Sequence, residues 1–213
     1  MNLPELYLSN EEKTMKILLA SRNKKKIAEL HKLMHEYVND IEILSLDDVG
    51  FYDEIVEDGT TFEENAMIKA KTGASLGYIC ISDDSGLEVD ALGGAPGVYS
   101  ARYAGEGATD EENNRKLQDA IKDVPDDECT ARYVCVVACA TPDGESFCVR
   151  EACEGKIIKE YRGNGGFGYD PMFFVEEFGC TFAETTPEQK NSISHRGKAM
   201  RVFCQRFLSV FGG

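Results

Sequence analysis

The sequence predicts an α/β protein with a mixed β-sheet and flanking helices, arranged as two lobes with a cleft between them. In residues 15–83, three short apolar runs of strand length alternate with segments of helical periodicity. In residues 130–158, two long strand-like runs flank Asp143-Gly144, which is a hairpin signal. A strand and a helix follow the hairpin. The alternating part and the hairpin part are therefore expected to form the two lobes.

Three strands and two helices are expected in the first part of the chain. The strands are MKILLAS, IEILSL and YICISD, at 15–21, 41–46 and 78–83. The first helix is expected over 23–38, where apolar residues follow helical spacing: Ile27, Leu30, Met34 and Val38. Thr61 and Glu64 have the spacing of a capping box, so a second helix begins there and closes near Gly73 or Gly77.

Two further helices and a strand are expected in the rest of the chain. Thr109 and Glu112 form another capping box, which opens the helix DEENNRKLQDAI. The segment GYDPMFFV, at 168–175, has the pattern of a strand. After Ser194, one face of a C-terminal helix gathers apolar residues: Ala199, Val202, Phe203, Phe207 and Val210.

Composition and charge limit the possible functions. The 213 residues are 42% hydrophobic and 29% charged, which is typical of a globular domain. The formal net charge of −15 argues against binding to nucleic acid, because non-specific binding needs a positive surface. No apolar run approaches the ~20 residues that span a membrane, and residues 1–14 lack the pattern of a signal peptide. Residues 1–14 are interpreted as an extension and 15–213 as one domain.

Eight cysteines occur, and none forms a Cys-x-x-Cys pair. Most lie in apolar, strand-like runs, and the spacing of zinc ligands is absent. Free cysteine behaves as a small hydrophobic residue and persists in reducing compartments. The cysteines are therefore interpreted as buried free thiols of a cytoplasmic protein.

A basic segment, SRNKKK at 21–26, joins the first strand to the first helix. Lysines near a helix N-terminus are disfavoured by the helix dipole by ~0.3–1 kcal/mol each, and a bound anion would reverse that effect. Free backbone N–H groups of the first turn, with Ser21 and Asn23, would add to the binding of such an anion. A solvated start to a surface helix explains the same pattern, so both interpretations stay open.

Two adjacent carboxylates, Asp83 and Asp84, end the third expected strand. Neighbours in a strand point to opposite faces, so the two are expected to have different roles. Ligands gather at the carboxyl ends of strands in open α/β sheets, where the basic segment also lies. A carboxylate that faces a phosphate there needs a divalent cation between the two, and Mg²⁺ fits oxygen ligands best. Glu57 or Asp58 would supply a second carboxylate, although loop solvation and helix capping also explain both acidic groups.

A glycine-aromatic loop, RGNGGFGYDP at 162–171, surrounds Phe167 and Tyr169 with glycines. Glycine lets the backbone approach a ligand closely, and an aromatic ring stacks on a base for ~1–3 kcal/mol. A tight connection before a strand is the structural alternative. Further on, His195 and Arg196 stand together beside an expected helix start, where they are a better donor pair for a carbonyl or phosphate oxygen than a lone histidine.

Five of these segments, taken in order, resemble the inosine triphosphate pyrophosphatase family, also called XTP/dITP diphosphatases. They are ASRNKKK, DGTTFEENAMIKA, DDSGLEVDALGGAPGVYSARYAG, GGFGYDP and ISHRGKA, and the resemblance runs from about Met15 to Phe211. It implies an elongated mixed sheet with two lobes, an active-site cleft between them, and a homodimer. It also implies Mg²⁺-dependent hydrolysis of ITP, dITP and XTP to the monophosphate and pyrophosphate, which cleanses the nucleotide pool.

The resemblance implies roles for individual residues. Asp84 matches the proton acceptor, Glu57 and Asp84 match the magnesium ligands, and Ser85 contacts the substrate beside them. The residues expected near the phosphates are Ser21, Arg22, Asn23, Lys24, Lys25, Lys26, Lys69 and Arg102. Those expected around the base are Phe167, Gly168, Tyr169, Asp170, Lys190, His195 and Arg196. Donors from Arg196 and His195 suit the 6-oxygen of hypoxanthine or xanthine and oppose the amino group of adenine.

Two other function classes stay open. A non-catalytic purine nucleotide-binding module would not need the metal carboxylates. A phosphomonoesterase that releases orthophosphate is suggested faintly by EDGTT, which is similar to the Asp-x-Asp-Gly-Thr motif of haloacid-dehalogenase-like phosphatases. The attacking aspartate of that motif would stand at Val56, so the nucleophile is absent.

Overall fold

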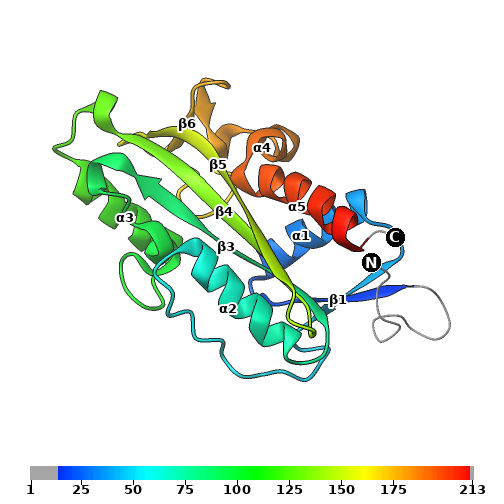
Figure 1. The fold of residues 1–213 in the computed structure, drawn as a ribbon. Helices are drawn as coiled ribbons and strands as arrows, with labels where there is room; N and C mark the ends of the chain where they lie inside the picture. The colour runs from blue at the N-terminus through cyan, green and yellow to red at the C-terminus, as the bar shows by residue number, and fades with distance from the viewer. Residues whose placement is uncertain (1–13, 212–213) are drawn as a thin grey trace. The chain divides into compact units, whose positions relative to one another are not determined.

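Seven strands form one mixed sheet in the computed structural model of the protein (Figure 1). The structure describes residues 14–211, apart from the side chains of Lys24, Lys25, Lys26 and Glu29. The strands are β1 (Met15–Leu19), β2 (Ile41–Ser45), β3 (Ile79–Val89), β4 (Thr130–Ala140), β5 (Ser146–Ile157), β6 (Phe173–Val175) and β7 (Cys180–Thr181). The longer helices are α1 (Lys24–Tyr37), α2 (Phe62–Ala74), α3 (Asp110–Ile121), α4 (Pro187–Ile193) and α5 (His195–Phe211).

The strand order is β2-β1-β3-β4-β5-β6-β7. β1 pairs in parallel with both β2 and β3, as expected for strands joined by crossover helices. β6 pairs antiparallel with both β5 and β7. β4 and β5 are neighbours joined by the tight turn at Gly144, whose φ is +97°. The predicted mixed α/β sheet with flanking helices and the predicted hairpin are therefore confirmed.

The described residues fall into two compact units, and each is considered by itself. The first takes residues 14–84, 136–150 and 197–211, and the second takes 85–135 and 151–196. No helix in the described part of the chain is long and apolar enough to cross a membrane.

The first unit contains the parallel strands. The apolar run of β1 is buried throughout Ile17–Leu19, as a strand with partners on both edges requires. α2 begins at the predicted capping box, in which the Thr61 Oγ1 accepts the Glu64 N–H at 3.1 Å and the Glu64 Oε2 accepts the Thr61 N–H at 3.2 Å. The box satisfies backbone donors that the first helical turn leaves without partners.

The prediction for the C-terminal helix is correct in place and partly wrong in its buried face. α5 begins at His195, directly after Ser194. Phe203 and Phe207 are fully buried, whereas Val202 and Val210 are about two-fifths exposed. Val202 lies to one side of the i, i+4 row that the buried residues form, and Val210 belongs to the last turn.

The prediction that the third strand ends at Asp83 is wrong. β3 continues through the sequence SDDSG as far as Val89. Leu87 and Val89 are fully buried, so the apolar pattern that resumes at Leu87 belongs to the same strand. Asp83 and Asp84 therefore lie within β3. The strand expected over 168–175 is, by contrast, shorter than predicted: β6 covers Phe173–Val175 and pairs there with β5 and β7.

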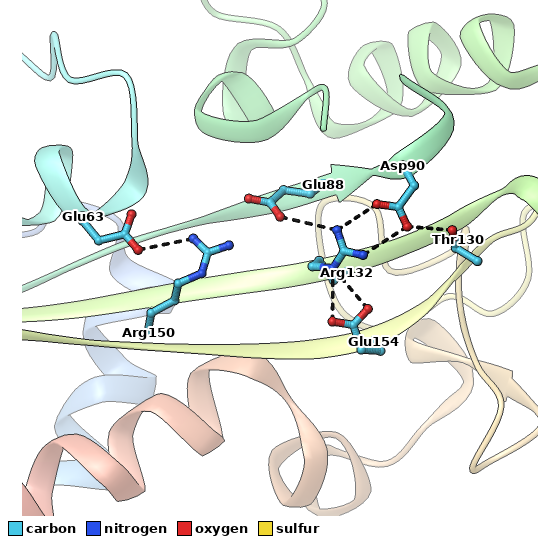
Figure 2. Close-up of polar contacts among 7 residues, drawn as sticks. All are labelled: Glu63, Glu88, Asp90, Thr130, Arg132, Arg150 and Glu154. Carbon is cyan, nitrogen blue, oxygen red and sulfur yellow. Dashed lines mark hydrogen bonds and ion pairs between the residues drawn. The ribbon is translucent and has the colours of Figure 1, made fainter. Parts of the chain in front are cut away.

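An ion-pair network joins the strands of the second unit and contains no predicted site residue (Figure 2). The Arg132 guanidinium donates to both oxygens of Asp90, at 2.9 and 3.0 Å, and its Nε donates to Glu154 at 3.1 Å. The Glu88 Oε2 lies 3.7 Å from the Arg132 Nη1, and the Thr130 hydroxyl also donates to Asp90. The hydrogen bonds from Arg132 lower the pKa of Asp90. The network therefore links β3, β4 and β5 through their side chains.

Candidate active site

Three charged side chains of the first unit meet at one point: Glu57, Lys69 and Asp84. Lys69 belongs to α2, Glu57 to the loop before that helix, and Asp84 to β3. The Lys69 Nζ lies 2.5 Å from the Glu57 Oε2 and 3.7 Å from the Asp84 Oδ1. The Lys69 and Asp84 side chains are only 11% and 13% exposed. The structure thus brings together the two carboxylates predicted to bind a metal, and adds a lysine predicted to contact phosphate.

Burial and charge act in opposite directions on the pKa of Lys69. Burial lowers the pKa, but the charges of Asp84, Asp83 and Glu57 outweigh it and raise the pKa above the ordinary value. Lys69 is therefore protonated at neutral pH. Its positive charge offsets the repulsion between carboxylates that burial would otherwise strengthen.

The Glu57 and Asp84 carboxylates have the chemistry that a hard divalent cation requires. Both supply oxygen ligands, and both approach the same ammonium group, so they already flank a position of positive charge. Within residues 14–211, no group of three or more His, Cys, Asp and Glu side chains could hold a metal ion. A cation held by Glu57 and Asp84 would take its other ligands from water and phosphate, as Mg²⁺ does at nucleotide sites. Asp58, the alternative to Glu57, is exposed.

The basic segment begins at the same edge of the sheet as this cluster. The Ala20 N–H donates to the Ile81 carbonyl at 2.8 Å, which extends the parallel pairing of β1 with β3. Ser21 follows Ala20 directly, and Ser82 to Asp84 follow Ile81 directly. The expectation that the basic segment and the acidic pair lie at neighbouring strands is therefore correct.

Two polar side chains of the basic segment form hydrogen bonds within the protein. The Ser21 Oγ accepts the Asn23 N–H at 3.3 Å, and the Arg22 guanidinium donates to the Phe51 carbonyl at 3.0 Å. α1 has no acidic residue in its first turn, so nothing in that turn offsets its lysines. The predictions for the side chains of Lys24, Lys25 and Lys26 lie outside the described part of the structure.

A second cluster lies within the second unit, around the glycine-aromatic loop. The Lys190 Nζ lies 2.6 Å from the Asp170 Oδ2 and 4.7 Å from the centre of the Phe167 ring. The same Asp170 oxygen accepts the Phe167 N–H at 2.9 Å. Gly166 has φ +73°, and a Cβ at this position would collide with the Asp170 carboxylate. Asp170 is fully buried, and it fixes both Phe167 and Lys190.

His195 and Arg196 open α5, and both are nearly fully buried in the second unit. The Arg196 guanidinium donates to the Ser85 Oγ at 3.2 Å. The His195 ring stacks on the ring of Tyr133, with 4.8 Å between the ring centres. The structure therefore connects two predicted site residues to the sheet: Arg196 to Ser85 of β3, and His195 to Tyr133 of β4. Ser85 follows Asp84 directly in the chain.

Tyr133 is a residue of this cluster that the sequence did not reveal. Its hydroxyl lies near the Asp170 carboxylate and the backbone of Tyr169, and both affect its pKa. Burial, and then the charge of Asp170, raise the pKa of Tyr133 well above its ordinary value, so the hydroxyl remains a donor. Tyr133 stands in the apolar alternation of a strand, where nothing in the sequence distinguishes it from a core residue. Tyr169, which was predicted, donates from its own hydroxyl to the Ser100 carbonyl at 2.8 Å.

Arg102, the remaining predicted phosphate residue, belongs to the second unit. Its guanidinium pairs with Glu106 at 3.2 Å and lies over the Tyr99 ring. None of the contacts described for Arg102 involves another predicted site residue. Its role in phosphate binding stays a prediction.

The fold and these two clusters define a class of protein. A mixed α/β sheet that combines a carboxylate–lysine cluster with a basic strand–helix turn is typical of proteins that bind phosphate compounds with a metal ion. The chain belongs to the Ham1 family, whose family model matches residues 17–206. The predicted family resemblance is therefore confirmed.

Relatives of known name are similar over nearly the full chain. A dITP/XTP pyrophosphatase of Desulforamulus reducens is 50% identical over 188 residues, which cover 88% of this chain and 92% of the relative. A dITP/XTP pyrophosphatase of Exiguobacterium sibiricum is 48% identical over 200 residues, which cover 93% of this chain and 100% of the relative.

Solved structures of the family have the same fold. The Ham1 protein of Staphylococcus aureus is 36% identical with a TM-score of 0.83, and a HAM1 protein of Coxiella burnetii is 39% identical with a TM-score of 0.84. Each comparison covers 91% of this chain and 98% of the other.

Proposed function

We propose that the protein hydrolyses non-standard purine nucleoside triphosphates (ITP, dITP and XTP) to the nucleoside monophosphate and pyrophosphate, and so removes them from the nucleotide pool. The observation that carries this proposal is the meeting of Glu57, Lys69 and Asp84 beside the start of the basic segment. The names of the relatives, dITP/XTP pyrophosphatases, support the choice of substrate and reaction. The family match over 17–206 supports treating residues 15–213 as one catalytic domain.

In this proposal Asp84 accepts the proton of the attacking water, and Lys69 stabilises negative charge on the phosphates. Glu57 and Asp84 would hold Mg²⁺, which supplies charge neutralisation and a lower pKa for water when bound. Ser21, Arg22, Asn23 and the three lysines that follow would hold the triphosphate through N–H groups and positive charge. Most of the rate enhancement then comes from positioning and charge, as in other phosphoryl transfers.

In this proposal, the cluster around the glycine-aromatic loop recognises the purine base. The Phe167 ring stacks on the purine, and Lys190 and Asp170 hold that ring in place. His195 and Arg196 donate to the 6-oxygen of hypoxanthine or xanthine, while Ser85 fixes the Arg196 guanidinium. Adenine would present a donor to those donors, and each buried group left without a partner costs ~1–3 kcal/mol.

We further propose a cytoplasmic homodimer. All eight cysteines are free and six are buried, which suits a reducing compartment. The dimer rests on the family resemblance. Size-exclusion chromatography with light scattering would measure the subunit number directly.

One assay separates this function from its alternatives. The protein is incubated with ITP, XTP, GTP or ATP in Mg²⁺, and the products are identified by ion-exchange chromatography. Pyrophosphate and monophosphate from ITP and XTP are expected, with much slower turnover of ATP. Orthophosphate as the first product would indicate a phosphomonoesterase. Binding of ITP without turnover would indicate a non-catalytic nucleotide-binding module.

A further inference from the structure

Two side chains of α3 hold the backbone of Gly168, in the middle of the glycine-aromatic loop. The Asp110 Oδ2 accepts the Gly168 N–H at 2.8 Å, and the Asn114 Nδ2 donates to the Gly168 carbonyl at 2.8 Å. Asp110 and Asn114 are four residues apart and therefore share one face of the helix. We propose that Asp110 and Asn114 are positioning residues that set purine specificity through Gly168. This inference rests on the function proposed above and deepens it.

Gly168 needs such a restraint because of its conformation. Its φ is +62°, in the left-handed region, and glycine can adopt this conformation as readily as several others. Phe167 precedes it and Tyr169 follows it, so a rotation at Gly168 changes the direction of the Phe167 ring relative to the buried Tyr169. Two hydrogen bonds on opposite sides of the residue select one of these conformations. The restraint by Asp110 and Asn114 therefore decides where the stacking ring lies.

Several other backbone groups of the loop also have hydrogen-bond partners. The Phe167 N–H donates to the Asp170 Oδ2 at 2.9 Å, and the Asp170 N–H donates to the Phe167 carbonyl at 3.3 Å. The Tyr169 carbonyl accepts the Met172 N–H at 2.9 Å. In the proposed function, the base is then recognised by the Phe167 ring and by nearby side chains. Moving the loop would therefore change base recognition and leave phosphate chemistry intact.

The environment of Asn114 also indicates a positioning role. Asn114 is 5% exposed, and within residues 14–211 its buried Oδ1 has no hydrogen-bond partner. A buried acceptor without a partner opposes folding, and a leucine of similar volume would avoid that cost. The neighbouring Asn113 differs, because it uses both ends of its amide, on the Ala104 N–H and the Ala101 carbonyl. The amide of Asn114 is therefore explained by its bond to Gly168 rather than by general stabilisation.

The test compares Asp110→Ala and Asn114→Leu on two substrates in Mg²⁺: ITP, and ribose 5′-triphosphate, which lacks a base. We expect kcat/KM for ITP to fall about 10- to 100-fold, through a higher KM, while kcat/KM for ribose 5′-triphosphate stays unchanged. Asp110→Asn keeps an oxygen acceptor for the Gly168 N–H and should retain most of the ITP activity. Glu111→Ala is the matched control, because it removes the same charge from the same helical turn, and the ion pair described for Glu111 is with exposed Arg115.

Equal losses on both substrates, or no loss on ITP, would overturn the inference. A second readout does not depend on activity: hydrogen exchange of the amides of residues 166–170. Exchange should become faster in Asp110→Ala and Asn114→Leu and stay unchanged in Glu111→Ala; unchanged exchange in the first two would also overturn the inference. If the wild type fails to cleave ITP, the proposed function is wrong, and the exchange measurement still decides whether α3 restrains Gly168.

Discussion

Tyr133 and His195 lie face to face, with 4.8 Å between ring centres and 13° between ring planes. The charge of the Asp170 carboxylate raises the pKa of the same tyrosine. A stacked neighbour restricts rotation of the imidazole. One strand residue therefore holds His195 and interacts electrostatically with Asp170, and both are proposed to line the base pocket.

Two variants distinguish the contribution of the Tyr133 ring from that of its hydroxyl. Tyr133→Phe keeps the stack on His195 and removes the buried hydroxyl near Asp170, so we expect a loss of about 1 kcal/mol in the free energy of unfolding and nearly normal ITP turnover. Tyr133→Leu also removes the stack, and we expect KM for ITP to rise about tenfold with a smaller change in kcat. Urea unfolding and steady-state kinetics measure the two effects. An unchanged KM in Tyr133→Leu would contradict the role assigned to the stack.

Lys69 should be essential for the chemical step. Lys69→Met removes the charge that Glu57 and Asp84 share, and with it a proposed stabiliser of phosphate charge. We expect kcat for ITP to fall by about 10²- to 10³-fold at saturating Mg²⁺. Lys71→Met is the control, because Lys71 is an exposed residue of the same helix. If Lys69 served only to neutralise the carboxylates, Lys69→Met would bind Mg²⁺ more tightly and keep its rate.

Asp84→Asn tests the assignment of the proton acceptor. The amide keeps the size of the side chain and loses its basicity and much of its affinity for a divalent cation. We expect single-turnover rates with ITP to fall at least about 10³-fold, whereas calorimetry should still detect binding of ITP. Asp58→Asn, at an exposed position beside Glu57, should be close to wild type. Near-normal turnover in Asp84→Asn would remove Asp84 from the mechanism.

The sequence could predict the fold because local signals agree with the tertiary structure. The capping boxes at Thr61 and Thr109 and the turn at Gly144 depend on residues close together in the chain, and all three are present. The end of β3 could not be predicted in this way. Two aspartates followed by serine and glycine usually mark a turn. Here the strand continues, because Leu87 and Val89 beyond them are buried.

The residues of the candidate site that belong to short sequence motifs could be predicted, whereas those placed by tertiary packing could not. The short-range motifs around Asp84, Asp170 and Arg196 pointed to residues that the structure joins by ion pairs and hydrogen bonds. Tyr133 and Asn114 act through neighbours that are distant in the chain, and strand and helix patterns alone assign both to ordinary positions. Only the three-dimensional structure reveals that Asn114 holds the glycine-aromatic loop and that Tyr133 stacks on His195.

The cysteines should differ in reactivity according to burial. Burial raises the pKa of the Cys80 and Cys204 thiols to about 12, so both stay protonated and inert at pH 8. Cys148 and Cys180 are partly exposed. We expect iodoacetamide at pH 8 to label Cys148 and Cys180 first, as mass spectrometry of peptides would show, and to label the buried pair only after unfolding. Rapid labelling of Cys80 in the native protein would contradict this burial.

The raised pKa of Cys80 also predicts how the free energy of unfolding depends on pH. The folded state holds the Cys80 proton more tightly than the unfolded chain, whose thiol has an ordinary pKa of 9.0. The free energy of unfolding should therefore be independent of this thiol below pH 9 and should decline as the pH rises from 9 toward about 12. Urea unfolding of the wild type and of Cys80→Ala over this range isolates the effect, since the variant lacks the titrating group. The difference between the two proteins in free energy of unfolding should shrink with rising pH, and a constant difference would show that Cys80 does not titrate as its burial requires.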